Sequence, residues 1–112
     1  MSTPHDQIHQ WVQANPVVLF MKGTAHQPLC GFSAVVSSLL QKLQIEFLAI
    51  NVLEDPAIRE GIKTYSNWPT IPQLYLKGEF IGGCDIVRDL YQNGELITIL
   101  ESKEISFQKI AS

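Results

Sequence analysis

The sequence VVLFM at residues 17–21 is followed by KGTAHQPL at 22–29 and by CGFS at 30–33. The five apolar residues have the length and composition of a short, fully buried strand. Residues 22–29 include a glycine, a proline and several polar residues, which is typical of a loop. From Phe32 onward, apolar residues recur with the period of a helix, at positions 35, 36, 39, 40 and 43. The pattern predicts a strand, a loop and a helix in succession, with Cys30 where the loop meets the helix.

The neighbouring segments continue this alternation of helix and strand. Ile8, Trp11 and Val12 have helical spacing, and Asn15-Pro16 ends their pattern. On the other side, residues 47–52 form an apolar run suited to a second buried strand. Alternating helices and strands favour a parallel pairing of the strands that they connect.

The middle of the chain predicts a helix and a hairpin. Asp55 is suited to be a helix N-cap and Pro56 to be the first helical residue, and we expect the helix to end near Tyr65. Residues 73–76 and 79–81 are separated by a tight Lys-Gly turn. This arrangement predicts two antiparallel strands.

Two more helices are expected, one opening at residues 82–85 and one near Glu95. The chain has 112 residues, of which 46% are hydrophobic and 17% charged, and this suits one core. We therefore predict a single α/β domain over residues 1–112, with a four-stranded mixed sheet flanked by helices and its core at about 5–100. Residues 102–112 are weakly patterned and are expected to form a loosely held C-terminal tail.

Charge and cysteine content exclude several functional classes. The net charge is −3 and no basic run is present, which argues against a nucleic-acid partner. No apolar run approaches the ~20 residues of a membrane span, and the first residues lack the pattern of a signal peptide. Cys30 and Cys84 lie far apart, which favours reactive or ligand thiols over a disulfide framework. We expect a cytoplasmic protein in a reducing compartment, with no membrane partner.

Cys30 is the strongest candidate for a chemical role. At the start of a helix, free N–H groups and the helix dipole favour a thiolate, which is both a nucleophile and a metal ligand. The alternative is a buried cysteine that acts as a small hydrophobic residue, but Gly31 and the preceding loop favour an exposed sulfur. Ser33 stands three residues later, so no second thiol is available there to resolve a mixed disulfide. Exchange chemistry would need an outside thiol or Cys84.

Four short motifs support a family resemblance, and they are Met21-Lys22-Gly23-Thr24, Cys30-Gly31-Phe32-Ser33, Asn67-Trp68-Pro69-Thr70-Ile71-Pro72 and Gly82-Gly83-Cys84-Asp85. In their order and spacing, the chain resembles bacterial monothiol glutaredoxins over roughly residues 5–100. A small departure is Ala25, which stands where a proline is common. The resemblance implies a thioredoxin fold, a glutathione groove beside the active cysteine, and a [2Fe-2S] cluster held between two subunits.

The resemblance also assigns glutathione contacts to two cations. Lys22 and Arg59 match the family positions that bind the glycine carboxylate of glutathione. A lysine supplies a point charge there, and an arginine supplies a fork of donors. The simpler interpretation is that both are solvated surface cations.

A second group of implied contacts comes from Thr70, Ile71 and Pro72. We expect a cis Ile71-Pro72 bond that turns the backbone groups of Ile71 toward the ligand. A peptide ligand could pair with Ile71 like an added strand. The alternative is a trans proline that only begins a strand.

The remaining implied contacts lie at the predicted helix start near residue 84. Gly83 permits close approach of the backbone, and the N–H groups of Cys84 and Asp85 can bind the γ-glutamyl carboxylate. The Asp85 side chain can accept from the amino group of glutathione or act as a plain helix cap. Three roles stay open for Cys84: its thiol could ligate iron, its thiol could resolve a disulfide with Cys30, or the residue could contribute only its backbone N–H while its side chain is a small buried group.

The function implied by the resemblance is the binding and transfer of a glutathione-ligated [2Fe-2S] cluster. Cys30 would be the reactive residue and the only metal ligand from each chain, in a homodimer bridged by the cluster. A BolA-like protein and iron-sulfur client apoproteins are the implied partners. Two alternatives are a glutathione-dependent thiol-disulfide oxidoreductase acting through Cys30 on glutathionylated proteins, and a regulatory protein whose cluster reports iron or redox status.

Overall fold

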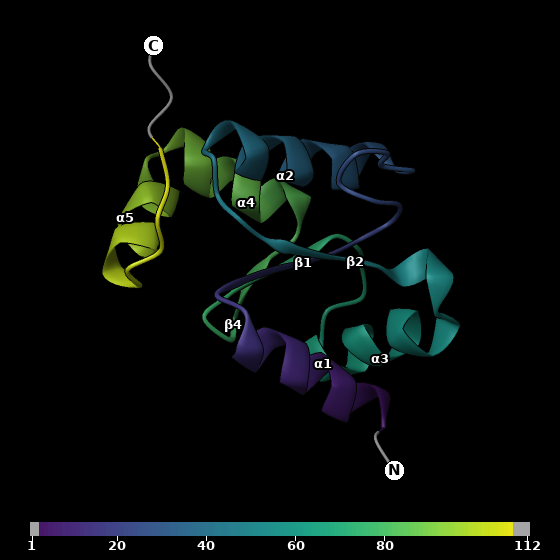
Figure 1. The fold of residues 1–112 in the computed structure, drawn as a ribbon. Helices are drawn as coiled ribbons and strands as arrows, with labels where there is room; N and C mark the ends of the chain where they lie inside the picture. Colours follow the sequence, from purple (N-terminus) through teal and green to yellow (C-terminus); the bar gives the residue numbers. More distant parts are fainter. Residues whose placement is uncertain (1–2, 109–112) are drawn as a thin grey trace.

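The computed structural model describes residues 3–108, in which helices and strands alternate along the chain (Figure 1). The elements, in order, are α1 (Pro4–Ala14), β1 (Val17–Met21), α2 (Gly31–Lys42), β2 (Leu48–Asn51), the 3-10 helix η1 (Val52–Glu54), α3 (Pro56–Ser66), β3 (Gln73–Leu76), β4 (Glu79–Gly82), α4 (Cys84–Gln92) and α5 (Glu95–Ser102). None of the helices within residues 3–108 combines the length and the apolar composition that a membrane span needs.

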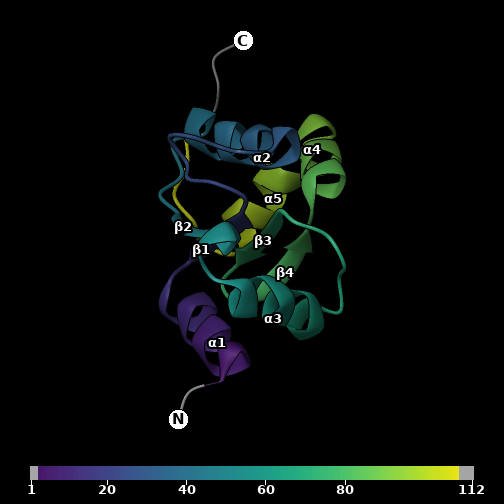
Figure 2. The same ribbon diagram turned by 90° about the vertical axis from the view of Figure 1, so that its right-hand side faces the viewer.

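The strands of this region form one mixed sheet in the order β2-β1-β3-β4. Strand β1 pairs in parallel with β2 and antiparallel with β3, and β3 pairs antiparallel with β4. Figure 2 shows α2 and α4 on one side of the sheet and α1 and α3 on the other. The predicted four-stranded mixed sheet flanked by helices is therefore confirmed. Strand β2 is shorter than the predicted 47–52, and it ends at Asn51 because the Asn51 side chain accepts the Leu53 N–H at 3.0 Å and starts η1.

The central strand β1 contributes to a hydrophobic core on each face of the sheet. Leu19 and Met21 are buried with residues of α2, α4 and α5, whereas Val18 and Phe20 are buried with residues of α1 and α3. Successive side chains of a strand point to opposite faces, so a strand buried on both faces is apolar throughout. Each such side chain stabilises the fold by about 1.5–3 kcal/mol. Strand β1 therefore anchors the loop that leads to Cys30.

Helix α3 begins and ends as its local sequence requires. The Asp55 carboxylate accepts the N–H groups of Ala57 at 3.0 Å and Ile58 at 3.4 Å, and Pro56 is the first helical residue. This predicted cap is confirmed. The helix ends at Ser66, one residue beyond the expected Tyr65, because Asn67 adopts the left-handed conformation with φ 56°. Helix α3 carries Arg59 and Lys63, which both line the same cavity.

The segment after α5 differs from the expected loose tail as far as Gln108. Ile105 is only 7% exposed and belongs to the core with α2, α4 and α5. The Gln108 N–H donates to the Leu43 carbonyl at 2.7 Å. A single buried apolar residue has no period, so the weak sequence pattern gave no sign of this docking. The rest of the predicted tail, residues 109–112, lies outside the described residues.

Candidate functional site

A cavity of about 470 Å³ lies where the ends of several elements meet. Its walls come from the loop after β1, the first turns of α2, helix α3, the segment before β3 and the start of α4. It brings together all nine site residues that the sequence predicted: Lys22, Cys30, Arg59, Thr70, Ile71, Pro72, Gly83, Cys84 and Asp85. Residues from five separate chain segments thus face one space.

Cys30 is the N-cap residue of α2 and is partly exposed to this cavity. The backbone N–H of Ser33 contributes most to lowering the pKa of the Cys30 thiol. The Phe32 N–H, the Ser33 hydroxyl and the charge of Lys22 lower this pKa further, whereas burial opposes them. A helix N-terminus that presents amides to a sulfur favours the thiolate. The position therefore favours the thiolate of Cys30, which is the form of a cysteine that acts as a nucleophile or as a metal ligand.

The Ser33 hydroxyl also connects Cys30 to the neighbouring cation. Ser33 is fully buried, and its Oγ accepts the Lys22 N–H at 3.0 Å. The residue that replaces a second thiol therefore holds the backbone of Lys22 beside the Cys30 sulfur. A buried hydroxyl that is hydrogen-bonded in this way fixes the relative position of the groups that it joins.

The loop over residues 22–29 is held in one conformation by hydrogen bonds. Gly23 has φ +91°, and a Cβ there would lie 2.5 Å from the Gln27 carbonyl oxygen, so the position requires glycine. The Gly23 N–H donates to Asn51 Oδ1 at 2.9 Å, and the Leu29 N–H donates to the Lys22 carbonyl at 2.9 Å. On the outer side, Gln41 donates to the carbonyl of Ala25 at 3.2 Å. The loop keeps its shape without the proline that is common at position 25.

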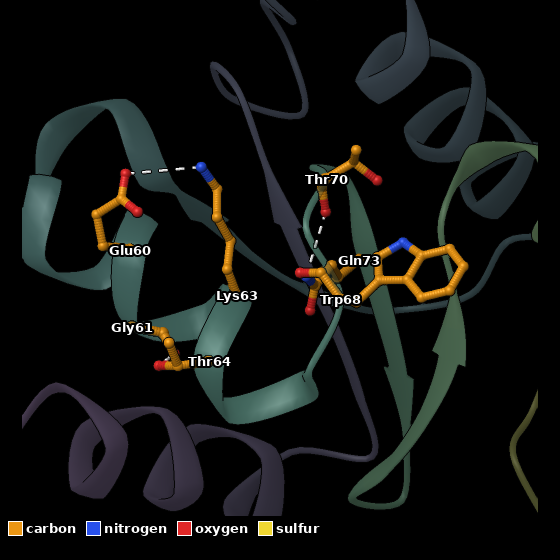
Figure 3. A network of polar contacts seen from close by, with 7 residues as sticks. All are labelled: Glu60, Gly61, Lys63, Thr64, Trp68, Thr70 and Gln73. Carbon is orange, nitrogen blue, oxygen red and sulfur yellow. Dashed lines mark hydrogen bonds and ion pairs between the residues drawn. The ribbon is translucent and has the colours of Figure 1, made fainter.

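Helix α3 contributes two cations to the cavity. Within residues 3–108, Arg59 Nε is buried and has no hydrogen-bond partner, which suits it to a ligand with an acceptor group. Lys63 was not predicted, although it lies four residues after Arg59 and hence on the same face of the helix. The Lys63 ammonium lies 3.6 Å from Glu60, which is exposed (Figure 3). With Lys22, these side chains make the cavity wall electropositive.

The segment before β3 forms another wall. The Ile71-Pro72 peptide bond is cis, as predicted, and Ile71 is 7% exposed. Trp68 and Pro69 also line the cavity, although the sequence did not indicate either of them as a site residue. The centroid of the Trp68 ring lies 5.8 Å from that of the Phe80 ring, so the indole packs against β4. Residues 68–72 thus line the same cavity as Cys30.

The start of α4 completes the cavity. Gly83 is the N-cap of α4. A Cβ at this position would lie 3.2 Å from the Pro72 carbonyl oxygen, so the Gly83 backbone packs closely against Pro72. Cys84 is 7% exposed, and burial raises the pKa of its thiol. The Asp85 carboxylate is exposed and lies 3.1 Å from Arg88. Of the three roles left open for the Cys84 thiol, this environment favours a neutral, small buried residue.

Two apolar residues on the rim were not identified as site residues. Phe32 is 62% exposed and Ile86 is 36% exposed, and both line the cavity mouth. Their positions follow the helical period of α2 and α4, so the sequence pattern alone assigns them to the core. Exposed apolar side chains beside Cys30 form a surface against which the apolar part of a ligand can pack.

Few side chains in the described part of the chain are placed to bind a metal ion. Within the described part of the chain, no group of three or more His, Cys, Asp and Glu side chains is placed to hold a metal ion. Cys30 and Cys84 are free thiols, and the pKa shifts favour the thiolate only at Cys30. Within the described residues, Cys30 is thus favoured over Cys84 as a thiolate ligand.

We expect iodoacetamide to alkylate Cys30 much faster than Cys84 at neutral pH. The pKa of Cys30 is lowered, so its rate should rise at a pH below the range of an ordinary thiol, whereas burial both raises the pKa of Cys84 and shields it. Mass spectrometry of Cys30→Ser and Cys84→Ser proteins between about pH 5 and 10 would resolve the two profiles. Equal rates with coincident midpoints would contradict the assignment.

Comparison with known proteins places this arrangement in a family. The glutaredoxin family model matches residues 17–81. A probable monothiol glutaredoxin 2 of Rickettsia typhi is 55% identical over 96 residues, which cover 86% of each chain. The structure of reduced poplar apo GrxS14 is 47% identical, with a TM-score of 0.78 and coverage of 88% of this chain and 90% of that one. A buckwheat glutaredoxin-glutathione complex is 26% identical, with a TM-score of 0.80 and coverage of 91% of each chain. The chain has the thioredoxin fold and belongs to the monothiol glutaredoxin family.

Proposed function

We propose that this chain binds glutathione in the cavity and, with it, binds and transfers a [2Fe-2S] cluster through Cys30. The observation on which the proposal rests is the gathering of a stabilised thiolate, three cations and the Ile71-Pro72 segment in one cavity. Glutathione has a carboxylate at each end and a thiol between them. A buckwheat relative with the same fold is described as a complex with glutathione, which supports this ligand.

The cations would bind one end of glutathione. Arg59 and Lys22 would contact the glycine carboxylate, and the unpaired Nε of Arg59 would gain an acceptor there. Lys63 lies on the same wall and would add to the positive potential, although Glu60 partly offsets it. Because the wall is concave, its charges are less screened than those of isolated surface cations.

The other end of glutathione would lie at the start of α4. The N–H groups of Cys84 and Asp85 belong to the first turn of the helix, where backbone donors have no helical partners. They would bind the γ-glutamyl carboxylate, with Gly83 allowing close approach. Asp85 would accept from the γ-glutamyl amino group in exchange for its exposed pair with Arg88. Backbone groups of Thr70 and Ile71 would hold the middle of the tripeptide.

Bound glutathione would complete a ligand set that one chain lacks. A [2Fe-2S] cluster takes about four thiolates, and the described part of this chain offers one favoured thiolate, Cys30. Two Cys30 thiolates and two glutathione thiolates from a homodimer would supply all four. The donor set therefore fits the cluster only as cargo shared between two chains. Cys30 would be the protein's metal ligand, and loading would be coupled to dimerisation.

The test is anaerobic loading of the purified protein with iron, sulfide and glutathione. We expect a visible absorption spectrum typical of a [2Fe-2S] cluster, together with a solution mass of two chains. Chemical analysis should give two glutathiones and two irons in each dimer. A loaded monomer, or a cluster that forms equally well without glutathione, would refute the proposal.

The lowered pKa of Cys30 also favours a second function, the glutathione-dependent reduction of mixed disulfides. Ser33 does not hinder this reaction, because a mixed disulfide with glutathione needs only one protein thiol. Robust turnover of a small glutathione mixed disulfide by the cluster-free protein would favour the oxidoreductase over the cluster carrier.

The partners and setting of the protein follow from the same proposal. We propose that residues 1–112 act as one domain and that the dimer passes its cluster to iron-sulfur client apoproteins. A BolA-like protein is a further expected partner because of the family resemblance. A cytoplasmic, reducing setting would keep Cys30 free for these roles.

A further inference from the structure

Gln73 is an unusual residue for its place in the fold. It is the first residue of β3, pairs with Phe20 of the central strand and is 0% exposed. Tyr75, two residues later, is on the same face of the strand and is buried with residues of α1 and α3. Glutamine is rarely buried completely, and a buried amide must find hydrogen-bond partners. Its partners therefore indicate what this position requires.

The side-chain amide of Gln73 is directed at the segment that forms one wall of the cavity. Its Nε2 donates to the carbonyl oxygens of Trp68 at 3.1 Å and Thr70 at 3.2 Å (Figure 3). Its Oε1 accepts from the Tyr75 hydroxyl at 3.4 Å. Both donors of the amide thus bind backbone groups that lie outside the sheet. The buried Gln73 side chain thus restrains the backbone of residues 68–70 through two hydrogen bonds.

The same segment is also held from the other side. The Trp68 N–H donates to the Ser66 hydroxyl at 3.1 Å and to the Lys63 carbonyl at 3.1 Å. Trp68 is therefore fixed at its N–H by the end of α3 and at its carbonyl by β3. Thr70 is exposed and has its carbonyl bound to Gln73. The contacts of Gln73 thus set where the backbone before Ile71 runs.

We propose that Gln73 is a positioning residue for glutathione, acting through the backbone of Trp68 and Thr70. This inference rests on the proposed function of the cavity. Gln73 does not line the cavity, whereas residues 68–72 do, so its effect on a ligand is indirect. Without its amide, two carbonyls lose their donors and the wall beside Cys30 can shift. The loss of this amide should weaken the binding of a ligand that contacts this wall, and it should leave the reactivity of the Cys30 thiol unchanged.

Two disulfides of different size would separate these effects in a Gln73→Leu protein. The Cys30 thiolate attacks oxidised glutathione, the Cys30–glutathione bond forms as the old disulfide breaks, and one glutathione thiolate leaves. Bis(2-hydroxyethyl) disulfide reacts in the same way but brings no peptide groups. We expect Gln73→Leu to lower the equilibrium constant for exchange of Cys30 with oxidised glutathione about tenfold. The equilibrium constant for exchange with bis(2-hydroxyethyl) disulfide should stay unchanged. Mass spectrometry of the mixed disulfides gives both constants.

Matched variants distinguish positioning from general loss of stability. Tyr75→Phe removes only the hydroxyl that contacts Gln73 Oε1, and Leu100→Val alters the core on the opposite face of the sheet. Neither should change the preference for glutathione. Gln73→Met, with an apolar side chain of similar length, should reproduce the loss if Gln73→Leu folds poorly.

The experiment distinguishes failure of the positioning role of Gln73 from failure of glutathione binding itself. A wild-type protein with no preference for glutathione over hydroxyethyl disulfide would refute glutathione binding itself. If the wild type shows that preference and the Gln73 variants keep it, the positioning role is refuted. An equal loss for both disulfides, the same loss in Leu100→Val, or failure of both Gln73 variants to fold would reduce Gln73 to a stability residue and overturn the inference.

Discussion

Replacement of Cys30 by serine is expected to abolish both the [2Fe-2S] cluster and the cluster-dependent dimer. The position favours a thiolate because the amides of α2 and the charge of Lys22 lower the pKa of the thiol. A serine hydroxyl does not supply the thiolate that iron-sulfur clusters require. Since each chain would contribute one ligand, the loss removes half of the set. The expected effect is complete loss and not weakened binding.

The matched control is Cys84→Ser, which removes the other cysteine from the same cavity. The Cys84 thiol is buried and its pKa is raised, so this protein should keep the cluster and the dimer with at most reduced stability. Visible absorption and size-exclusion mass after anaerobic loading measure both properties. The bridging arrangement fails if Cys84→Ser loses its colour as completely as Cys30→Ser, or if Cys30→Ser still dimerises when loaded.

Replacement of Lys22 and Arg59 together by alanine is expected to weaken glutathione-dependent retention of the cluster severely. Each lost charge-assisted contact should cost about 1.5–3 kcal/mol if it is well made, and about tenfold in affinity for each 1.4 kcal/mol. Both residues line the cavity, and the buried, unpaired Nε of Arg59 has most to gain from a ligand. Solvent screening at the open side lowers the contribution of Lys22.

A double variant with the same change in net charge provides the control. Lys42→Ala with Lys77→Ala also removes two positive charges, but both lysines are exposed and lie outside the cavity. Cluster loss is followed by visible absorption as glutathione is varied, with circular dichroism to confirm the fold. An unchanged glutathione dependence in the Lys22 and Arg59 variant would return these residues to the class of surface cations. Equal effects in both double variants would indicate a response to net charge alone.

Much of the architecture follows from local sequence. The apolar run at 17–21 can be stable only when it is covered on both faces, so a buried central strand was predictable. The Asp55 cap and Pro56 start of α3 depend on backbone donors within one helical turn. Cys30 at a helix start likewise follows from its neighbours. The cap, the start of α3 and the position of Cys30 need only interactions over a few residues, which the order of side chains specifies directly.

The sequence motifs identified most of the site residues, but only the fold brings these residues together. The nine predicted residues come from separate segments, and only the crossing of β1, α3, β3 and α4 brings them to one cavity. Lys63 had a detectable signal, its spacing of four residues from Arg59, but spacing alone does not say which helix face meets a cavity. The sequence signal for Phe32 and Ile86 was misleading, because their positions in the helical period also fit a buried core, whereas both side chains are exposed.

The sequence by itself determined the order of elements, the central strand and the position of Cys30 at a helix N-terminus. Tertiary structure alone decided that Ile105 docks on the core, that Ser33 joins Lys22 to Cys30, and that Gln73 holds the carbonyls of Trp68 and Thr70. The physical reason is the range of the interactions. Capping and periodicity act between close neighbours, whereas the burial of a polar or isolated apolar residue depends on partners that only the folded chain brings near.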